Sequence, residues 1–273
     1  TAAQATRGHL AAATSGLTEA EGIFRELRLK RPRCLALANL AELLTWQGEP
    51  LQARQRAHVA VELARELDYK LGATAATRAM SVAALDLGLY DEAEVGLNTA
   101  LDLAMGIDLP EEILASLVGL TQLALERSCL SEARRYGVRG IEVVLRRDPE
   151  RYLPVLQVHL ARAEAASDPV AARALIDKAE ATLADIPVPR RTQVQLGLAY
   201  ALLAQGDREG ARRAARTVLQ TAGSRGFRLL SLEARALMAH LTDGEEQKTH
   251  RSVGQELARD FTAALAPEMA RSF

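Results

Sequence analysis

The chain has few cysteines, few aromatic residues and no long apolar run. Its 273 residues include two cysteines, Cys34 and Cys129, and aromatic residues make up 4% of the sequence. Two cysteines are too few for a disulfide framework or a thiolate metal site. The apolar stretches are far shorter than the roughly 18 residues that span a bilayer, and no basic segment followed by an apolar one suggests a secretion leader. We therefore expect a cytoplasmic protein without a membrane partner.

Charge of one sign is not in excess either. The 34 lysines and arginines nearly balance the 35 aspartates and glutamates, which gives a net charge of −1. Binding to nucleic acid or to an anionic surface draws on clustered positive charge, so no nucleic-acid partner is expected. Isoleucine, threonine, tyrosine and phenylalanine are scarce, while alanine and leucine are abundant. This composition disfavours strands and favours helices.

A short pattern recurs along the chain with an almost fixed period. Each copy has a turn residue, then an alanine, then a second small residue seven positions after that alanine. The turn residues are Gly8, Gly48, Gly88, Ser128, Ser167 and Gly206. The alanines are Ala13, Ala53, Ala93, Ala133, Ala172 and Ala211, so consecutive copies lie 40 or 39 residues apart. The second small residues are Ala20, Ala60, Ala100, Gly140, Ala179 and Val218. Six copies in register indicate a repeat protein.

A second set of turn signals divides each period. These signals stand at 67–69, 106–110, 147–149, 185–189 and 223–226. Between the turns, apolar residues recur at helical spacing, as in Val59 and Leu63. Asp168 followed by Pro169 is a typical helix start, because the carboxylate accepts backbone N–H groups that the helix leaves free. Each repeat is therefore predicted to be a pair of antiparallel helices, with small residues where the two helices cross closely. Such pairs bury their apolar faces only when they stack.

The repeats resemble the tetratricopeptide repeat (TPR) family. Gly88-Leu89-Tyr90-Asp91-Glu92-Ala93 is similar to the family's turn, and Asn39-Leu40-Ala41 with Leu44 is similar to its first helix. The period of 39 to 40 residues is similar to the longer TPR branch, as in bacterial TPR regions linked to signal-transduction ATPases and kinases. The resemblance implies an all-α fold, a right-handed α-solenoid of antiparallel helix pairs with about six repeats.

The repeat frame also predicts a domain organisation. We expect one solenoid domain over 1–273, cut from a larger multidomain protein. Its expected parts are a partial first repeat at 1–33, repeats at about 34–73, 74–113, 114–152, 153–191 and 192–229, and a C-terminal capping pair at 230–273. Residues 1–8 look like the end of a helix whose beginning is missing. Residues 265–273 resemble the closing stretch of bacterial kinase- or ATPase-linked TPR regions.

The sequence holds none of the motifs that mark common catalytic sites. It has no phosphate-binding glycine loop, no nucleophile elbow and no zinc-binding histidine pair. His58 and Glu62 share a helix face, which we interpret as a solvated polar pair and not as a metal site. Cys34 follows Arg31 and Arg33, whose charges could lower its thiol pKa, although a structural or incidental thiol is the preferred interpretation. We expect no enzyme, no cofactor and no metal.

In TPR arrays the first helix of each pair lines the concave face. The resemblance therefore implies a partner-binding groove formed by Asn39, Glu42, Trp46, Arg78, Asp86, Gln122, Glu126, Gln157, Glu164 and Tyr200. Trp46 is the strongest single candidate, because amphipathic aromatic residues are enriched at interface hot spots; packing against a neighbouring repeat is the alternative. Glu42 and Asp86 would repel a terminal carboxylate, so we expect a partner with basic and apolar residues.

The densest charge run extends from Arg25 to Arg33. We interpret it as cations placed favourably at the C-terminus of a helix. Docking on an acidic partner is the alternative.

The leading hypothesis for function is a non-catalytic protein–protein interaction module or scaffold of a cytoplasmic, bacterial signalling or regulatory protein. It would bind a peptide or a helix in its concave groove. The alternative is a sensor domain that binds a small ligand or short peptide and regulates an attached kinase, ATPase or transcription-activator domain. A nucleic-acid-binding repeat is disfavoured, because the groove positions carry more acidic than basic residues. Self-association through the first repeat is a further hypothesis.

Overall fold

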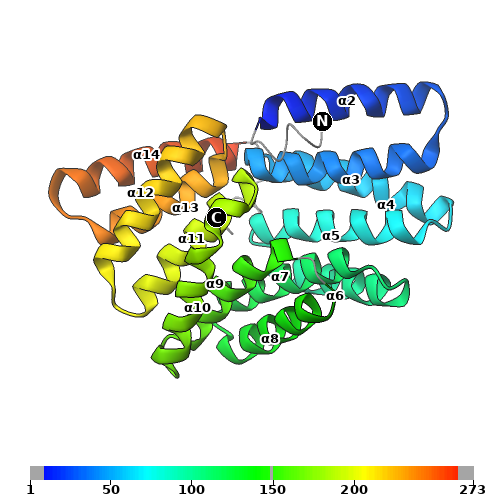
Figure 1. Cartoon of the computed structure of the whole chain (residues 1–273). Helices are drawn as coiled ribbons and strands as arrows, with labels where there is room; N and C mark the ends of the chain where they lie inside the picture. Colours follow the sequence, from blue (N-terminus) through cyan, green and yellow to red (C-terminus); the bar gives the residue numbers. More distant parts are fainter. Residues whose placement is uncertain (1–8, 148–149, 264–273) are drawn as a thin grey trace.

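The computed structural model describes residues 9–147 and 150–263, which are helical and contain no strand (Figure 1). The α-helices are α2 (Leu10–Glu26), α3 (Lys30–Gln47), α4 (Pro50–Glu66), α5 (Lys70–Asp86), α6 (Tyr90–Gly106), α7 (Pro110–Glu126), α8 (Leu130–Arg147), α9 (Leu153–Glu164), α10 (Pro169–Ala181), α11 (Val188–Ala204), α12 (Arg208–Arg225), α13 (Arg228–Leu241) and α14 (Gly244–Ala263). Two short 3-10 helices are η1 (Glu150–Tyr152) and η2 (Leu183–Asp185). Within these ranges no helix is both long enough and apolar enough to span a bilayer.

The helices form an all-α solenoid of antiparallel pairs, as the repeat frame predicts. The pairs are α3–α4, α5–α6, α7–α8, α9–α10, α11–α12 and α13–α14, and α2 precedes them in the described residues. Four pairs begin at Lys30, Lys70, Pro110 and Val188, ahead of the expected repeat starts at 34, 74, 114 and 192. The division into domains stays a prediction. The expected helix end at 1–8, residues 148 and 149 of one turn signal, and the closing stretch at 265–273 lie outside the described residues.

A left-handed backbone residue ends each of the first six described helices at a constant spacing of twenty residues. These residues are Arg28, Gly48, Asp68, Gly88, Asp108 and Ser128, with φ between 46° and 75°. At Gly48 and the residue after it, N–H groups donate to the carbonyls of Thr45 and Leu44, the paired hydrogen bonds of a Schellman C-cap. The same pair of bonds recurs at the other five positions. These turns of two or three residues are therefore built in the same way within and between repeats, and their spacing of twenty residues leaves helices of about five turns.

Small residues lie where neighbouring helices cross. The first alanine of each copy of the pattern is completely buried, from Ala13 to Ala211. Ala20 on α2 is only partly buried. Some crossings are close enough to require glycine: a Cβ on Gly197 of α11 would lie 2.4 Å from Val158 Cγ2 of α9. The expected role of the small residues is thus confirmed.

The two ends of the described array meet. The pairs stack in chain order and turn back, so that α13 packs against α3 (Figure 1). A set of buried residues that we call the closure cluster joins α2 and α3 to α11, α12 and α13. Its members are Leu10, Ala13, Leu43, Leu196, Val218, Ala222, Phe227, Leu230 and Ala234. Outside the cluster, Arg228 Nη1 of α13 lies 3.2 Å from Glu49 Oε1 at the end of α3. The concave side is therefore enclosed and not an open groove.

Candidate functional site

The first helices surround a cavity at the centre of the molecule. This inner cavity has a volume of about 120 Å³. Its lining comes from α3, α5, α7, η1, α11 and α13 and includes no residue of a second helix: Glu42, Thr45, Trp46, Arg78, Ala79, Val82, Leu85, Asp86, Ala115, Val118, Gly119, Gln122, Tyr152, Arg190, Gln193, Leu229, Leu230 and Glu233. Apolar side chains contribute the larger share of the wall, and nine of the eighteen lining residues are polar or charged. A ligand site likewise combines an apolar wall with polar groups that converge on it.

A second, larger cavity adjoins the first. This outer cavity has a volume of about 430 Å³ and reaches Leu10 and Leu17 of α2 and the prolines before and at the start of α11. The two cavities share Glu42, Trp46, Arg78, Tyr152 and Arg190. They therefore form one continuous space, with the inner cavity as its deeper and more enclosed end.

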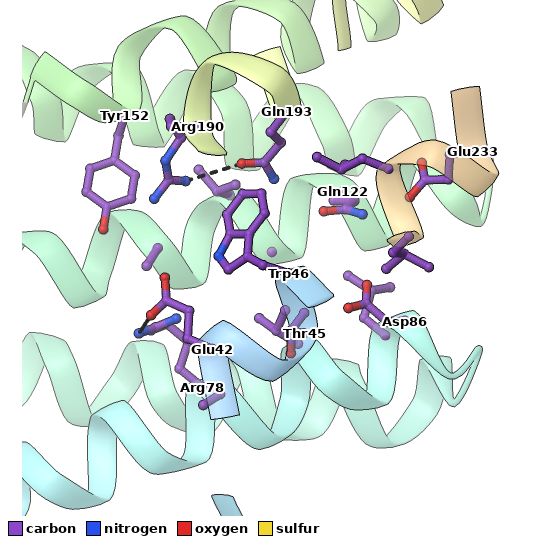
Figure 2. Close-up of a pocket in the computed structure, with 18 residues that line it drawn as sticks. Glu42, Thr45, Trp46, Arg78, Asp86, Gln122, Tyr152, Arg190, Gln193 and Glu233 are labelled. Atoms are coloured by element: carbon purple, nitrogen blue, oxygen red, sulfur yellow. Dashed lines mark hydrogen bonds and ion pairs between the residues drawn. The ribbon is translucent and has the colours of Figure 1, made fainter. Parts of the chain in front are cut away.

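Trp46 lies between the two polar ends of the inner cavity. Figure 2 shows its indole with Glu42, Arg78, Arg190 and Tyr152 on one side. On the other side are Asp86, Gln122 and Glu233. The last turn of α3 positions this side chain, and its ring lies 6.1 Å from the ring of Phe227 in the closure cluster, tilted by 58°. Trp46 thus lines the cavity and also packs against a distant repeat, and its role in binding a partner stays a prediction.

The end of the cavity beside η1 is an ion-pair network. Arg78 bridges two carboxylates, with its Nε 2.7 Å from Glu112 Oε2 and its Nη2 3.3 Å from Glu42 Oε2. Burial works against the charged form of Arg78, but both carboxylates outweigh it and raise its pKa. Burial alone would raise the pKa of Glu42, but Arg78 and Arg190 hold it below its ordinary value. These groups are charged and mutually satisfied, so Arg78 is not available to clamp a carboxylate.

The opposite end holds two carboxyl groups that have no cation partner within the described residues. Asp86 is at the C-terminus of α5 and Glu233 is on α13. The Oδ2 atom of Asp86 is inaccessible and has no hydrogen-bond partner there. Burial, together with the charge of Glu233, raises the pKa of Asp86 well above its ordinary value. Burial and then Glu126 raise the pKa of Glu233 to about 7, although Arg162 acts in the opposite direction.

Six of the ten expected groove residues line the continuous space. Asn39, Glu42, Trp46, Arg78, Asp86 and Gln122 contribute to one or both cavities. All six come from the first three first helices, α3, α5 and α7. Their role in binding a partner stays a prediction.

The other four expected groove residues lie outside both cavities. Glu126 is exposed and pairs with Arg162, at 3.4 Å. Tyr200 lies beneath the same guanidinium, and its ring centroid is 4.7 Å from Arg162 Cζ. Gln157 is buried inside α9. Glu164 points toward α8, where its Oε2 lies 3.3 Å from Arg134 Nε. These four are engaged in packing or ion pairs between repeats.

Several residues that line the inner cavity come from the second half of the chain and were not predicted from the sequence. Tyr152, Arg190, Gln193, Leu230 and Glu233 line the inner cavity but were not expected there. Gln193 accepts a hydrogen bond from Arg190 Nη1, at 3.5 Å. Tyr152 lies beneath the same guanidinium, and its ring centroid is 4.7 Å from Arg190 Cζ. Glu233 stands one turn after the start of α13, and only the closure of α13 onto α3 brings it inward. No local signal in the sequence marks that closure.

Two further reactive side chains, Cys34 and His159, are buried. Cys34 is completely buried and its Sγ donates to the carbonyl of Ala60 at 3.3 Å. Burial raises the pKa of this thiol, so the alternative of a thiolate activated by Arg31 and Arg33 is wrong. Burial and the nearby guanidinium charges of Arg162 and Arg190 lower the pKa of His159 to about 3, so this histidine is neutral. In the part of the chain that the structure describes, no three His, Cys, Asp or Glu side chains are grouped as metal ligands.

The basic run between α2 and α3 is engaged with its neighbours. Arg33 Nε lies 2.7 Å from Glu21 Oε1, and Lys30 pairs with Glu66. The guanidinium of Arg31 lies over the ring of Tyr69, at 5.3 Å. These contacts support a structural interpretation of the run.

Comparison with known proteins adds little beyond the fold. No family model matches the chain, and no curated protein matches it. Among solved structures, the crystal structure of yeast Tom70 aligns with it at 15% identity and a TM-score of 0.45. The alignment covers 95% of this chain and 62% of the Tom70 chain, so the present chain spans less than two thirds of that protein. At this similarity the match carries no information on function.

Proposed function

We propose that the chain is a non-catalytic protein-interaction module that holds a short segment of a partner in the continuous space inside the solenoid. The observation that carries this proposal is the lining of the inner cavity, which comes from the inner helices of five repeats and is mostly apolar around a central tryptophan. Interface hot spots have this character, with an aromatic anchor in a desolvated pocket. A cytoplasmic, bacterial signalling or regulatory protein remains the setting we propose.

The size of the space bears on the form of the occupant. Volumes of about 120 Å³ and 430 Å³ suit a few residues of an extended peptide or a molecule of similar size. An α-helix with its side chains is about 10–12 Å across. A helix would therefore require the contacts between α3 and α13 to open. Of the two occupants first considered, the extended peptide fits the closed form.

The enclosure of the site favours a second candidate function. An occupant surrounded by α3, α5, α7, α11 and α13 contacts both ends of the array at once. Binding would therefore stabilise the closed form against more open ones. This is the behaviour of a sensor domain that responds to a small ligand or a short peptide and controls attached domains.

Selection of peptides tests the interaction module. A library of random peptides displayed on phage is panned against the chain, and the affinity of each selected peptide is then measured for wild type and for Trp46→Ala. We expect the selected peptides to lose about thirtyfold in affinity in Trp46→Ala, the loss typical of a hot-spot residue. The matched control is Val95→Ala, which removes an exposed side chain from the outer helix α6, and it should change nothing.

Two results would contradict this function. Peptides whose affinity is the same for wild type and Trp46→Ala, but lower for Val95→Ala, would place the binding surface on the outer helices. Failure to select any Trp46-dependent peptide, combined with thermal stabilisation by a small molecule, would favour the sensor. Circular dichroism and the thermal midpoint of each variant show that a loss of binding is not a loss of fold.

A further inference from the structure

At the end of the inner cavity opposite Arg78, two carboxyl groups have no cation partner within the described residues. Asp86 and Glu233 come from helices that are far apart in the sequence and meet only because α13 closes onto the array. Neither forms an ion pair in the part of the chain that the structure describes. A desolvated carboxylate without a partner is costly, so this pair is either protonated or neutralised by an occupant.

The cations nearest to the pair are already engaged. Arg162 is held by Glu126 and lies over Tyr200. Arg78 is held by its two carboxylates at the other end of the cavity. Within the described residues, neither of these guanidinium groups forms an ion pair with Asp86 or Glu233, although the charge of Arg162 acts on Glu233. Apolar side chains of α5, α7 and α13 form the wall between the two polar ends of the cavity. The indole of Trp46 completes this wall (Figure 2).

We propose that Asp86 and Glu233 form a receptor for one ammonium or guanidinium group, whose apolar or planar stem lies against Trp46. The proposal rests on the proposed function, since it assumes that the cavity is the binding site, and it adds the chemistry of the occupant. Two carboxylates can accept several hydrogen bonds from a planar guanidinium. The face of an indole attracts the same cation. Lysine or arginine side chains of a peptide and free small amines share this chemistry.

Binding of a cation should release protons. Both carboxyl pKa values are raised by burial in the cavity, and a bound cation would lower them again because it favours the charged form. The other titratable groups that interact electrostatically with Glu233 are Tyr90 from α6, Glu126 from α7, Arg162 from α9 and Tyr200 from α11. Helix α3 contributes Thr45 and Trp46, which do not titrate in the same range. The affinity for a cation should therefore rise between about pH 6 and pH 8.

Matched probes can test this receptor through Trp46, the single tryptophan of the chain. The first probe is a blocked arginine, N-acetyl-arginine methylamide, and its neutral counterpart is the blocked citrulline of nearly the same shape. Indole fluorescence and titration calorimetry report binding, and calorimetry in buffers of different ionisation enthalpy counts the protons released. Agmatine and putrescine, which carry no peptide backbone, represent free small amines.

The test variant is Asp86→Asn with Glu233→Gln, which keeps the shape of both side chains. The control is Asp102→Asn with Glu142→Gln, which removes the same charge from exposed positions on α6 and α8. We expect wild type and the control to bind blocked arginine about tenfold more tightly than blocked citrulline, the value of one charged hydrogen bond. In the test variant this preference and the proton release should both disappear.

The outcomes separate this receptor from the proposed function. Equal affinity for arginine and citrulline in wild type, an unchanged preference in the test variant, or no binding of any cationic probe would each overturn the receptor. Peptides that depend on Trp46 but show no preference for basic residues would overturn it as well, while the interaction module would stand. Tighter binding of blocked arginine and lysine than of the free amines would support a peptide source, and the reverse order would support a small-molecule source; both support the receptor.

Discussion

Among single residues, burial and neighbouring charge decide what each ionisable group of the inner face can do. Arg78 is only 12% exposed, but it is held charged because two carboxylates contact it. His159 is buried beside two guanidinium groups and is therefore neutral. Asp86 and Glu233 both line the inner cavity, and burial raises the pKa of each carboxyl group. The charge of the site is thus set by pairing and not by residue type.

The raised pKa of Glu233 predicts how stability depends on pH. Its pKa rises from 4.5 to about 7 on folding, so the folded state holds a proton that the unfolded state has lost. The stability from this protonated form is present below about pH 4.5 and is lost as pH rises toward 7. Glu233→Gln stays neutral, so its stability relative to wild type should increase between about pH 5 and pH 8. This rise in pKa corresponds to a change of about 3 kcal/mol in the free energy of unfolding. Solvent screening lowers the expected change to about 2 kcal/mol.

Urea unfolding of both proteins across this pH range measures the effect. Glu142→Gln on the exposed side of α8 is the control, and its difference from wild type should stay constant. A constant difference for Glu233→Gln as well would show that Glu233 ionises normally in the folded protein.

Single residues also show which parts of the site can be predicted from the sequence. The positions of Glu42, Trp46 and Arg78 follow from the repeat frame, because they stand on the inner face of long, regular first helices. Gln157 and Glu164 follow the same frame but are buried or paired with α8. They belong to α9, the shortest α-helix described, where the regular period breaks down. Glu126 and Tyr200 stand on the regular 17-residue helices α7 and α11 but also lie outside both cavities. Constant helix length therefore does not by itself place a predicted residue in the site.

Among the elements, the turns control the architecture. Helices of 17 or 18 residues alternate with turns of two or three residues through the first three pairs. Each turn requires one residue with positive φ, and the sequence supplies glycine at some turns and aspartate, arginine or serine at others. Left-handed backbone costs a residue with a Cβ about 1–2 kcal/mol. The Schellman hydrogen bonds compensate for it by satisfying the carbonyl groups at the end of each helix.

This cost predicts that Ser128→Gly stabilises the protein. Ser128 has φ of 58° between α7 and α8. Glycine removes the strain but loses about 0.5–1 kcal/mol through the greater freedom of the unfolded chain. A net gain of about 0.5 kcal/mol is expected, seen as a higher urea midpoint with an unchanged slope.

A second serine in an equivalent turn provides the comparison. Ser167 precedes α10, does not have positive φ, and accepts a hydrogen bond from Arg134 at 2.6 Å. Ser167→Gly should therefore lower the urea midpoint. If Ser128→Gly lowered it too, strain at the turn would not be the controlling factor.

In the whole molecule, contacts between distant repeats turn an array into a closed body. The closure cluster, the Trp46–Phe227 pair and the Glu49–Arg228 ion pair all join helices from opposite ends. Phe261 of α14 adds a close approach, since a Cβ on Gly48 would lie 2.5 Å from its Cε1. Each contact is modest, but together they decide whether the inner face is a cavity or a groove.

Reversal of one charge across the closure tests this shape. Arg228 Nη2 also lies 3.3 Å from Asp260 Oδ2, so Arg228→Glu replaces two attractions by repulsions and should cost about 1 kcal/mol. We expect a larger radius of gyration by small-angle X-ray scattering and a red shift of Trp46 emission. Exchange of both charges, Glu49→Arg with Arg228→Glu, should restore part of the compaction.

The matched control for the closure is Arg216→Glu. Arg216 pairs with Glu246, which joins α12 to the nearby α14 and not to the first repeat. It should leave the radius of gyration unchanged. If Arg228→Glu also left the radius unchanged, the apolar closure cluster alone would hold the two ends together.

The sequence by itself determined the helices, their pairing and the face of each first helix that points inward. These features depend on local terms: helical periodicity, turn residues at fixed spacing and small residues at crossings. Only the tertiary structure decided that the ends meet, that Glu233 joins Asp86 and that Arg78 is neutralised by its neighbours. The curvature of a solenoid is the sum of small rotations at every repeat. No single position encodes that sum, so the enclosed site becomes visible only when all the repeats are in place.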